Sequence, residues 1–329
     1  MQLQDLDKLV MPWPDEGREW DGLPMARVGL RAALYFGNGH STDLRRELLA
    51  IVERYIALAG GRIRAYQRAG DRARQVASPD KPVDLGRLRD RVENFKTDWS
   101  IELSSEPDVN VASLWSLVAV ADHSGYLLLH FPVSVFKDAE PGAFRGMFRQ
   151  WCDALKVQHA YAGLGFALPV GGRSMSAALQ RSAPYATRFV GLDLDYPNTV
   201  ASRCQDGIRT VNWLTAIDAA RLRRIGGAQT VARVSGPEVQ AVEYGQGTIF
   251  VAGEAPQLGD AETGNVPQAY VQLGHAVAPL RVDMHEAWFE PPAGYEAPDG
   301  FAAKSGWRDA EPSELPALHY TQAWLARFG

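Results

Sequence analysis

The sequence has 329 residues, of which 46% are hydrophobic and 22% are charged; this composition is ordinary for a soluble globular protein, argues against a disordered chain and allows a sizeable core. The length suits one large domain or two smaller ones. The formal net charge is −5 and is unevenly distributed along the chain.

Acidic residues gather near the C-terminus. From Glu254 to Gly329 the sequence has eleven acidic and four basic residues, a net charge of −7, which leaves +2 for residues 1–253. Such a sector repels phosphate, so it argues against direct binding of nucleic acid there and is compatible with a basic protein partner. Solvated loops that keep the protein in solution are the alternative explanation.

The two cysteines, Cys152 and Cys204, are too few for a disulfide framework and indicate reduced thiols. The first residues lack a basic stretch followed by an apolar one, so we expect no signal peptide. No apolar run approaches the roughly 20 residues that span a bilayer. We therefore expect a cytoplasmic protein without a membrane partner.

In chain order, residues 1–26 are expected to form an irregular N-terminal arm. The apolar run from Val28 to Phe36 predicts a strand that ends in a Gly-Asn-Gly turn. Apolar residues at helical spacing then predict a helix that begins near Ser41 and ends near Ala59. The arginine-rich segment from Arg62 to Arg74 is interpreted as the wet basic face of a strand or helix rather than a phosphate site.

A β-rich block and an amphipathic helix complete the first half. The predicted strands are Trp99–Ser104, Leu114–Asp122 and Tyr126–Phe136, and the predicted helix is Gly142–His159. The sequence His-Ser-Gly at 123–125 predicts a hairpin between the last two strands. In the small, apolar stretch that follows, Gly163 and Gly165 would permit close packing.

The Gly171-Gly172 pair marks the expected internal joint. Beyond it the predicted strands are Phe189–Asp195, Val211–Ile217, Val239–Tyr244 and Thr248–Ala252, and the predicted helices are Met175–Tyr185, Asp218–Arg224, Pro267–Val277 and Tyr320–Phe328. The irregular interleaving and the hairpins favour an α+β fold with mixed or antiparallel sheets and flanking amphipathic helices. We expect two similar-sized subdomains, 27–170 and 171–329, packed together.

Side chains that could bind a metal are few. Asp283, His285 and Glu286 lie close together in the sequence, and Asp193 and Asp195 would share one face of a strand. Either group could contribute to a metal site, but neither has a matched partner elsewhere, and surface or capping carboxylates are the simpler interpretation. A metal-dependent hydrolase that uses Asp193, Asp195 and His285 is therefore kept as one alternative.

Signatures of other chemistry are weak. No Gly-x-Ser-x-Gly elbow occurs, and Cys152 lies on the apolar face of its helix, which indicates inert packing. His130 and His159 could act as acid or base near neutral pH, although a lone histidine beside an apolar strand is more often structural. The sequence indicates no cofactor.

Several segments together resemble a known family. These are Gly207–Trp213, Ala255–Asp260 and Pro267–Tyr270, with Leu127–Phe131, Tyr161–Phe166 and Leu325–Phe328. As a set they resemble the type VI secretion immunity family, and the resemblance covers roughly residues 25–328. It implies a non-enzymatic inhibitor, encoded beside a toxin that neighbouring bacteria inject, which binds that toxin. Several toxins paired with this family are nucleases of the VRR-Nuc, restriction-endonuclease-like type.

The resemblance supplies no catalytic residues and no cofactor. Given the acidic C-terminal segment, the candidate toxin-binding surface is acidic and consists of Asp260, Glu262, Asp283, Glu286 and Glu290. The main hypothesis is thus a cytosolic protein that neutralises a nuclease toxin. Besides the hydrolase, a non-catalytic scaffold or dimerisation module stays open as an alternative, and a homo-oligomer is compatible with either.

Overall fold

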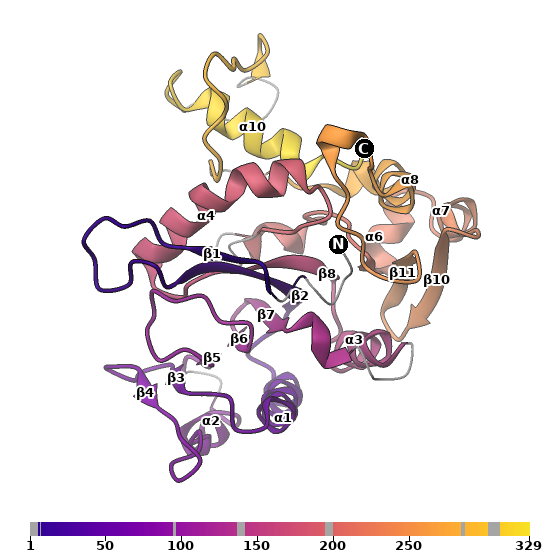
Figure 1. Ribbon diagram of the computed structural model, residues 1–329. Coiled ribbons are helices and arrows are strands. Elements are labelled where there is room, and N and C mark those ends of the chain that lie inside the picture. The colour runs from indigo at the N-terminus through magenta and orange to yellow at the C-terminus, as the bar shows by residue number, and fades with distance from the viewer. Residues whose placement is uncertain are drawn as a thin grey trace.

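The computed structural model describes residues 6, 8–94, 97–136, 142–194, 200–283, 287–301 and 310–329. Within them, 11 strands form one large antiparallel sheet that carries helices on both faces (Figure 1). The predicted α+β class, with an antiparallel sheet and flanking helices, is confirmed.

The strand order is β10-β11-β9-β8-β2-β7-β6-β5-β3-β4, and β1 pairs with β2. The strands are β1 (Val10–Pro12), β2 (Pro24–Gly37), β3 (Ala65–Arg68), β4 (Gln75–Val76), β5 (Ser100–Ser104), β6 (Ser116–Val120), β7 (Ser124–Phe131), β8 (His159–Ala167), β9 (Leu214–Asp218), β10 (Val239–Tyr244) and β11 (Gly247–Ala252). The α-helices are α1 (Thr42–Ala59), α2 (Gly86–Asp90), α3 (Ala143–Ala154), α4 (Gly172–Arg188), α6 (Ala219–Arg224), α7 (Ala228–Val234), α8 (Gln268–Val277) and α10 (Leu315–Leu325).

The long strand β2 is the centre of the sheet. It pairs with β7 from Leu30 to Gly37 and with β8 from Arg27 to Tyr35. Most of its side chains are buried on both faces, which requires cover from both sides. Helices α1 and α3 lie on one side of the sheet, and α4, α8 and α10 lie on the other (Figure 1).

The sheet continues across residues 170 and 171. Strand β8 pairs with β9, from Ala162 opposite Leu214 to His159 opposite Ile217, and β9 in turn pairs with β11. Strands from both expected subdomains therefore share one hydrogen-bonded ladder. The division into subdomains itself stays a prediction.

The hairpin predicted at 123–125 forms between β6 and β7, and a second hairpin joins the predicted strands that became β10 and β11. The helices α1, α6 and α8 begin and end within one or two residues of their predicted limits. These elements combine a strong apolar period with turn residues at both ends, so local signals suffice to place them.

Other predictions were wrong in detail. The chain leaves the sheet after Phe131, because Pro132 cannot donate to the ladder. The helix predicted to reach His159 ends at Ala154, and His159 begins the buried strand β8. Phe189–Asp195 forms no strand in its described part; only Asp193 makes an isolated bridge, to Gly165. Val10–Pro12, in the expected irregular arm, forms β1.

Two glycines of β8 allow the layers to approach closely, as predicted. A Cβ at Gly163 would lie 2.0 Å from Oδ1 of Asn212, and a Cβ at Gly165 would lie 2.9 Å from Cδ of Arg31. Both distances are shorter than the non-bonded contacts that Cβ atoms make in proteins. Side chains from a neighbouring segment and from β2 therefore occupy the space that a larger residue in β8 would need.

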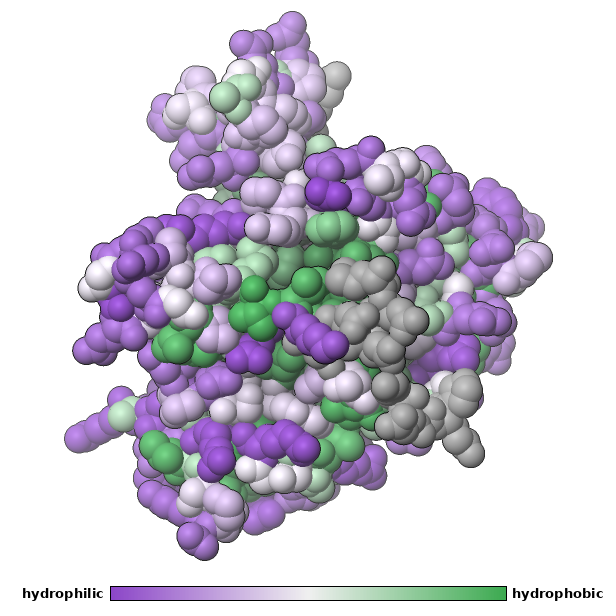
Figure 2. Space-filling view, in the orientation of Figure 1, coloured by the Kyte–Doolittle hydropathy of each residue, from purple (hydrophilic) through white to green (hydrophobic). Residues whose placement is uncertain are grey.

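The C-terminal helix closes the core. Trp324 of α10 donates from Nε1 to the carbonyl of Ala186, 3.1 Å away, and packs edge-on against Phe289. The part of the chain around α10 projects from the body, and its surface is mostly hydrophilic (Figure 2). Exposed carboxylates in and near it are Glu290, Glu296, Asp299, Glu311 and Glu314.

Candidate functional site

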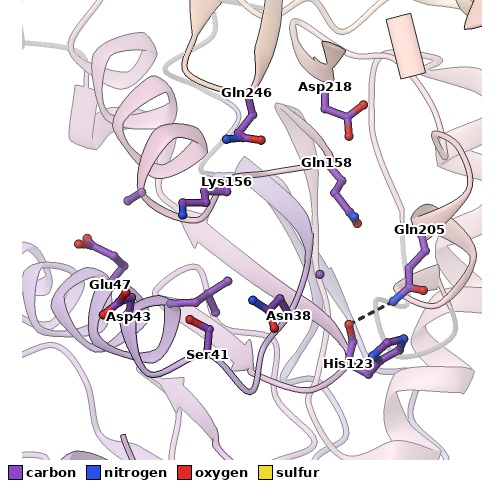
Figure 3. A pocket seen from close by; sticks show the side chains of 13 residues that line it. Asn38, Ser41, Asp43, Glu47, His123, Lys156, Gln158, Gln205, Asp218 and Gln246 are labelled. Atoms are coloured by element: carbon purple, nitrogen blue, oxygen red, sulfur yellow. Dashed lines mark hydrogen bonds between the residues drawn. The ribbon is translucent and has the colours of Figure 1, made fainter. Parts of the chain in front are cut away.

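A cleft of about 580 Å³ opens where several central strands end. The end of β2, the start of β7 and β8, and the end of β9 border it, together with the first turns of α1 (Figure 3). Its polar side chains are Asn38, Ser41, Asp43, Glu47, His123, Lys156, Gln158, Gln205, Asp218 and Gln246. The cleft thus brings together residues that are far apart in the sequence, from Asn38 to Gln246.

Two residues of the cleft adopt left-handed backbone conformations. Asn38 has φ 61° and Lys156 has φ 47°, and no other non-glycine residue in the described ranges has positive φ. Asparagine tolerates this region, whereas for lysine it costs about 1–2 kcal/mol. The turn at Lys156 separates α3 from β8 and so shapes one wall of the cleft.

The cleft is suited to polar recognition. Gln205 donates from Nε2 to the carbonyl of His123 at 3.1 Å and to Oγ of Ser124 at 2.6 Å, which fixes its amide. The side chain of Asp218 accepts from the backbone N–H of Arg221 at 2.7 Å and caps α6. Because amides both donate and accept, this lining can bind a polar peptide segment or a small polar molecule.

The histidines singled out in the sequence lie elsewhere. His130 and His159 are buried in the sheet, and Nδ1 of His159 lies 3.1 Å from the carbonyl oxygen of Ala216. Burial lowers the pKa of each imidazole to about 3, so both are neutral at physiological pH. Cys152 is also buried, and desolvation raises the pKa of its thiol. The structural interpretation of these three side chains fits their surroundings.

Asp193 lies in a buried cluster of charges. Its Oδ1 is 2.8 Å from Nη1 of Arg209, and its Oδ2 is 3.3 Å from Nη1 of Arg31. Although burial raises the pKa of the carboxyl group, the guanidinium groups of Arg209 and Arg31 lower it to about 2. Both oxygens of Asp193 thus face guanidinium groups, which occupy the positions that a metal ion would need.

The remaining members of the hypothetical hydrolase site, Asp195 and His285, lie outside the described residues, as does Glu286. Within the described ranges, no three His, Cys, Asp or Glu side chains are grouped closely enough to hold a metal ion. Likewise, none of the helices that the structure describes is both long and apolar enough to cross a membrane.

A model of the protein family described as "Type VI immunity for VRR-NUC" matches residues 97–296, more than half of the chain. The chain belongs to this family. The match contains the hairpin strands β6, β7, β10 and β11, the central strand β8 and much of the acidic segment. The family resemblance expected from the sequence is therefore confirmed.

A solved structure has a similar fold. It is the type VI secretion system protein PA0821 of Pseudomonas aeruginosa, which superimposes with a TM-score of 0.75 at 22% sequence identity. The similarity covers 96% of this chain and 91% of that one. No protein in a search of curated proteins matches the sequence.

In this immunity-family member, the candidate acidic surface divides into two groups. Asp260 and Glu262 both pair with Arg188, at 3.1 and 2.9 Å. Asp283 is exposed and accepts from Nε2 of Gln322 at 3.1 Å, and Glu290 is exposed. Arg188 offsets part of the charge of the first group, whereas Asp283 and Glu290 are exposed to solvent.

The sequence did not indicate the cleft. Asn38 belongs to a turn that was predicted, but nothing local shows that Lys156, Gln158, Gln205 and Gln246 converge on it. Three of these are glutamines, and they belong to no sequence motif that would mark a site. No local signal was available, because the apolar spacing of α3 continues through Leu155 and Val157 and hides the turn before β8.

Proposed function

We propose that this protein binds a cognate VRR-Nuc toxin of a type VI secretion system and neutralises it in the cytoplasm. The family match over residues 97–296 carries the proposal. The toxin would be encoded beside this gene, and the contact would involve protein surface rather than nucleic acid.

The charge distribution supports a basic partner. A nuclease needs a positive surface to hold DNA, and the exposed carboxylates of the C-terminal part are complementary to such a surface. Long-range attraction of this kind raises the association rate more than it strengthens the final complex. We propose that Asp283, Glu286 and Glu290, with Asp260 and Glu262 beside Arg188, form this steering surface.

The test begins with co-expression of this protein and the product of the adjacent gene, followed by co-purification and a DNA-cleavage assay. We expect a stable complex and loss of cleavage on adding an equimolar amount of this protein. If the purified toxin neither binds this protein nor loses activity, the proposed function is wrong.

Charge reversal tests the steering surface. In the double variant Asp283→Lys/Glu290→Lys we expect the association rate to fall about tenfold at low salt and to become less dependent on salt. The matched control is Asp80→Lys/Asp90→Lys, which makes the same change in net charge at exposed positions near β4 and α2. Equal rates for the two double variants, measured by stopped-flow fluorescence, would remove this surface from the interface.

A further inference from the structure

The sheet has an open edge at β10. In the order of strands among the described residues, β10 is last, and it pairs with β11 alone. It spans six residues, whereas β4, at the opposite edge, spans two. An edge strand of this length presents unpaired backbone groups to which another chain can add.

The hydrogen-bond pattern shows which groups face outwards. The backbone N–H of Gly253 donates to the carbonyl of Glu238, and this pairing belongs to the same register as Gln240 opposite Val251. Hydrogen-bonded pairs alternate in an antiparallel ladder, so the backbone groups of Gln240, Val242 and Tyr244 face β11. Those of Ala241 and Glu243 therefore face away from the sheet, and both residues are exposed.

An apolar groove of about 250 Å³ lies beside this edge. Its floor is formed by Leu214, Val242, Ile249 and Val251, and its wall by the first half of α3. The wall is open at Gly146, where an added Cβ would meet no atom within 4 Å. The side chains of Gln240 and Val242 line the groove, so a strand added at the edge would direct alternate side chains to the same face.

The rim of the groove is basic. Arg145 and Arg149 of α3 both line it, and the only carboxylate within 4.0 Å of either among the described ion pairs is Asp153, 3.9 Å from Nε of Arg149. An occupant with a carboxylate beside an apolar side chain would match this rim. A second copy of β10, paired antiparallel about Ala241, would bring Gln240, Val242 and Tyr244 to this face, and the carboxylate of the same parity, Glu238, lies outside the strand, directly before it.

We propose that the edge of β10 receives an extended segment of the toxin, added as a further strand, whose alternate side chains place an apolar group in the groove and a carboxylate against Arg145 and Arg149. This inference rests on the proposed function and names the part of the molecule that makes the close contact. The acidic surface attracts the toxin from a distance, and the β10 edge holds one of its segments.

Two variants block the edge in different ways. Gly146→Leu fills the groove from a position with free space, and it replaces the residue with nearly the lowest helix propensity by a good helix former, so the fold should become slightly more stable. Ala241→Pro removes an outward N–H at an edge position, where proline is tolerated. We expect each to weaken binding of the purified toxin, measured by calorimetry, by about tenfold or more.

The matched control is Gly172→Leu. Gly172 is in α4, on the opposite side of the sheet, and an added Cβ there also meets no atom within 4 Å. This variant should bind the toxin as tightly as the wild type does. Arg145→Glu should weaken binding, and an Arg145→Lys variant should recover most of it.

The outcomes separate the two proposals. Failure of the wild-type protein to bind the toxin would refute the proposed function. Wild-type binding that persists unchanged in both Gly146→Leu and Ala241→Pro would overturn the docking edge and leave the proposed function intact. The docking edge would also be wrong if these variants altered only the sedimentation of the protein without toxin, because the edge would then join two copies of this chain.

Discussion

At the scale of single residues, the centre of the molecule depends on one buried carboxylate. Asp193 faces Arg31 and Arg209, whose side chains are 2% and 0% exposed. Arg209 also lies over the rings of Tyr161, Trp288 and Trp324, at 5.1, 5.3 and 5.7 Å from their centroids. The charge of Asp193 therefore compensates cations that could not otherwise be removed from water.

Replacing Asp193 by Asn should be strongly destabilising. The variant would leave the buried guanidinium groups without their counter-charge, and we expect a loss of about 3–5 kcal/mol in the free energy of unfolding. Urea denaturation measures this loss. The control is Glu53→Gln, which breaks the exposed pair with Arg89 and should cost less than about 1 kcal/mol. Similar losses in the two variants would contradict the compensating role of Asp193.

The buried histidines should make the fold sensitive to mild acid. Each imidazole has a pKa of about 3 in the folded protein, against an ordinary value of 6.5, so the unfolded chain binds the proton first as the pH falls. The free energy of unfolding is therefore not reduced by these histidines above pH 6.5. Below that pH it declines, by about 2 kcal/mol per histidine at pH 5.

The variant His159→Gln tests this linkage. The difference in unfolding free energy between pH 7 and pH 5 should be smaller than in the wild type, even though the variant is less stable at both. Changing the exposed His123 to Gln serves as the comparison and should leave the difference as it is. If the difference in unfolding free energy between pH 7 and pH 5 is the same in His159→Gln as in the wild type, this imidazole does not contribute to the loss of stability in acid.

At the scale of elements, the side chains that pack against β8 require glycine at two of its positions. Its glycines accept Asn212 and Arg31 at distances that no larger residue permits. Asn212 in turn accepts from the backbone N–H of Trp213 at 2.7 Å, just before β9 begins. The conformation of the segment before β9 therefore depends on the space that Gly163 leaves for Asn212 by having no side chain.

Gly163→Ala should therefore be costly. Its methyl group would displace Asn212, and we expect a loss of about 1–3 kcal/mol, measured by thermal or urea unfolding. Gly146→Ala offers the opposite case, because its Cβ has open space and alanine favours the helix by up to about 1 kcal/mol. A neutral Gly163→Ala would mean that Asn212 moves aside without loss.

At the scale of the whole molecule, the main feature is a sheet that runs without interruption through both halves of the chain. The β8–β9 ladder joins the two halves of the sequence that meet at the Gly171-Gly172 pair. When such a sheet unfolds, its strands lose their shared backbone hydrogen bonds and their buried side-chain contacts at the same time. The position of a glycine pair thus marks the start of α4 rather than a gap in the sheet.

We accordingly expect one cooperative unfolding transition. Differential scanning calorimetry should give a single peak whose calorimetric and van't Hoff enthalpies agree. Two resolved peaks would instead support independently unfolding subdomains on either side of residue 170.

The sequence predicted those parts of the molecule in which local pattern decides the structure. The two hairpins and the helices α1 and α8 have their turns and apolar periods in neighbouring residues. Strand β8 has no polar alternation because it is buried on both faces, and Asp193 gave no sign that two distant arginines surround it. The cleft around Lys156 and the groove at Gly146 arise only when separate elements meet, so no single segment could reveal them.

The stack of Arg209 beneath Trp288 and Trp324 has a consequence for the timing of biosynthesis. Arg31, Asp193 and Arg209 leave the ribosome before the tryptophan-bearing helix α10 is made, so these three side chains can meet before α10 is present to cover them. Until α10 docks, water retains access to that centre, and the nascent chain cannot complete its core. A half-made copy would therefore lack a finished core, and under the proposed function only completed copies could neutralise a toxin.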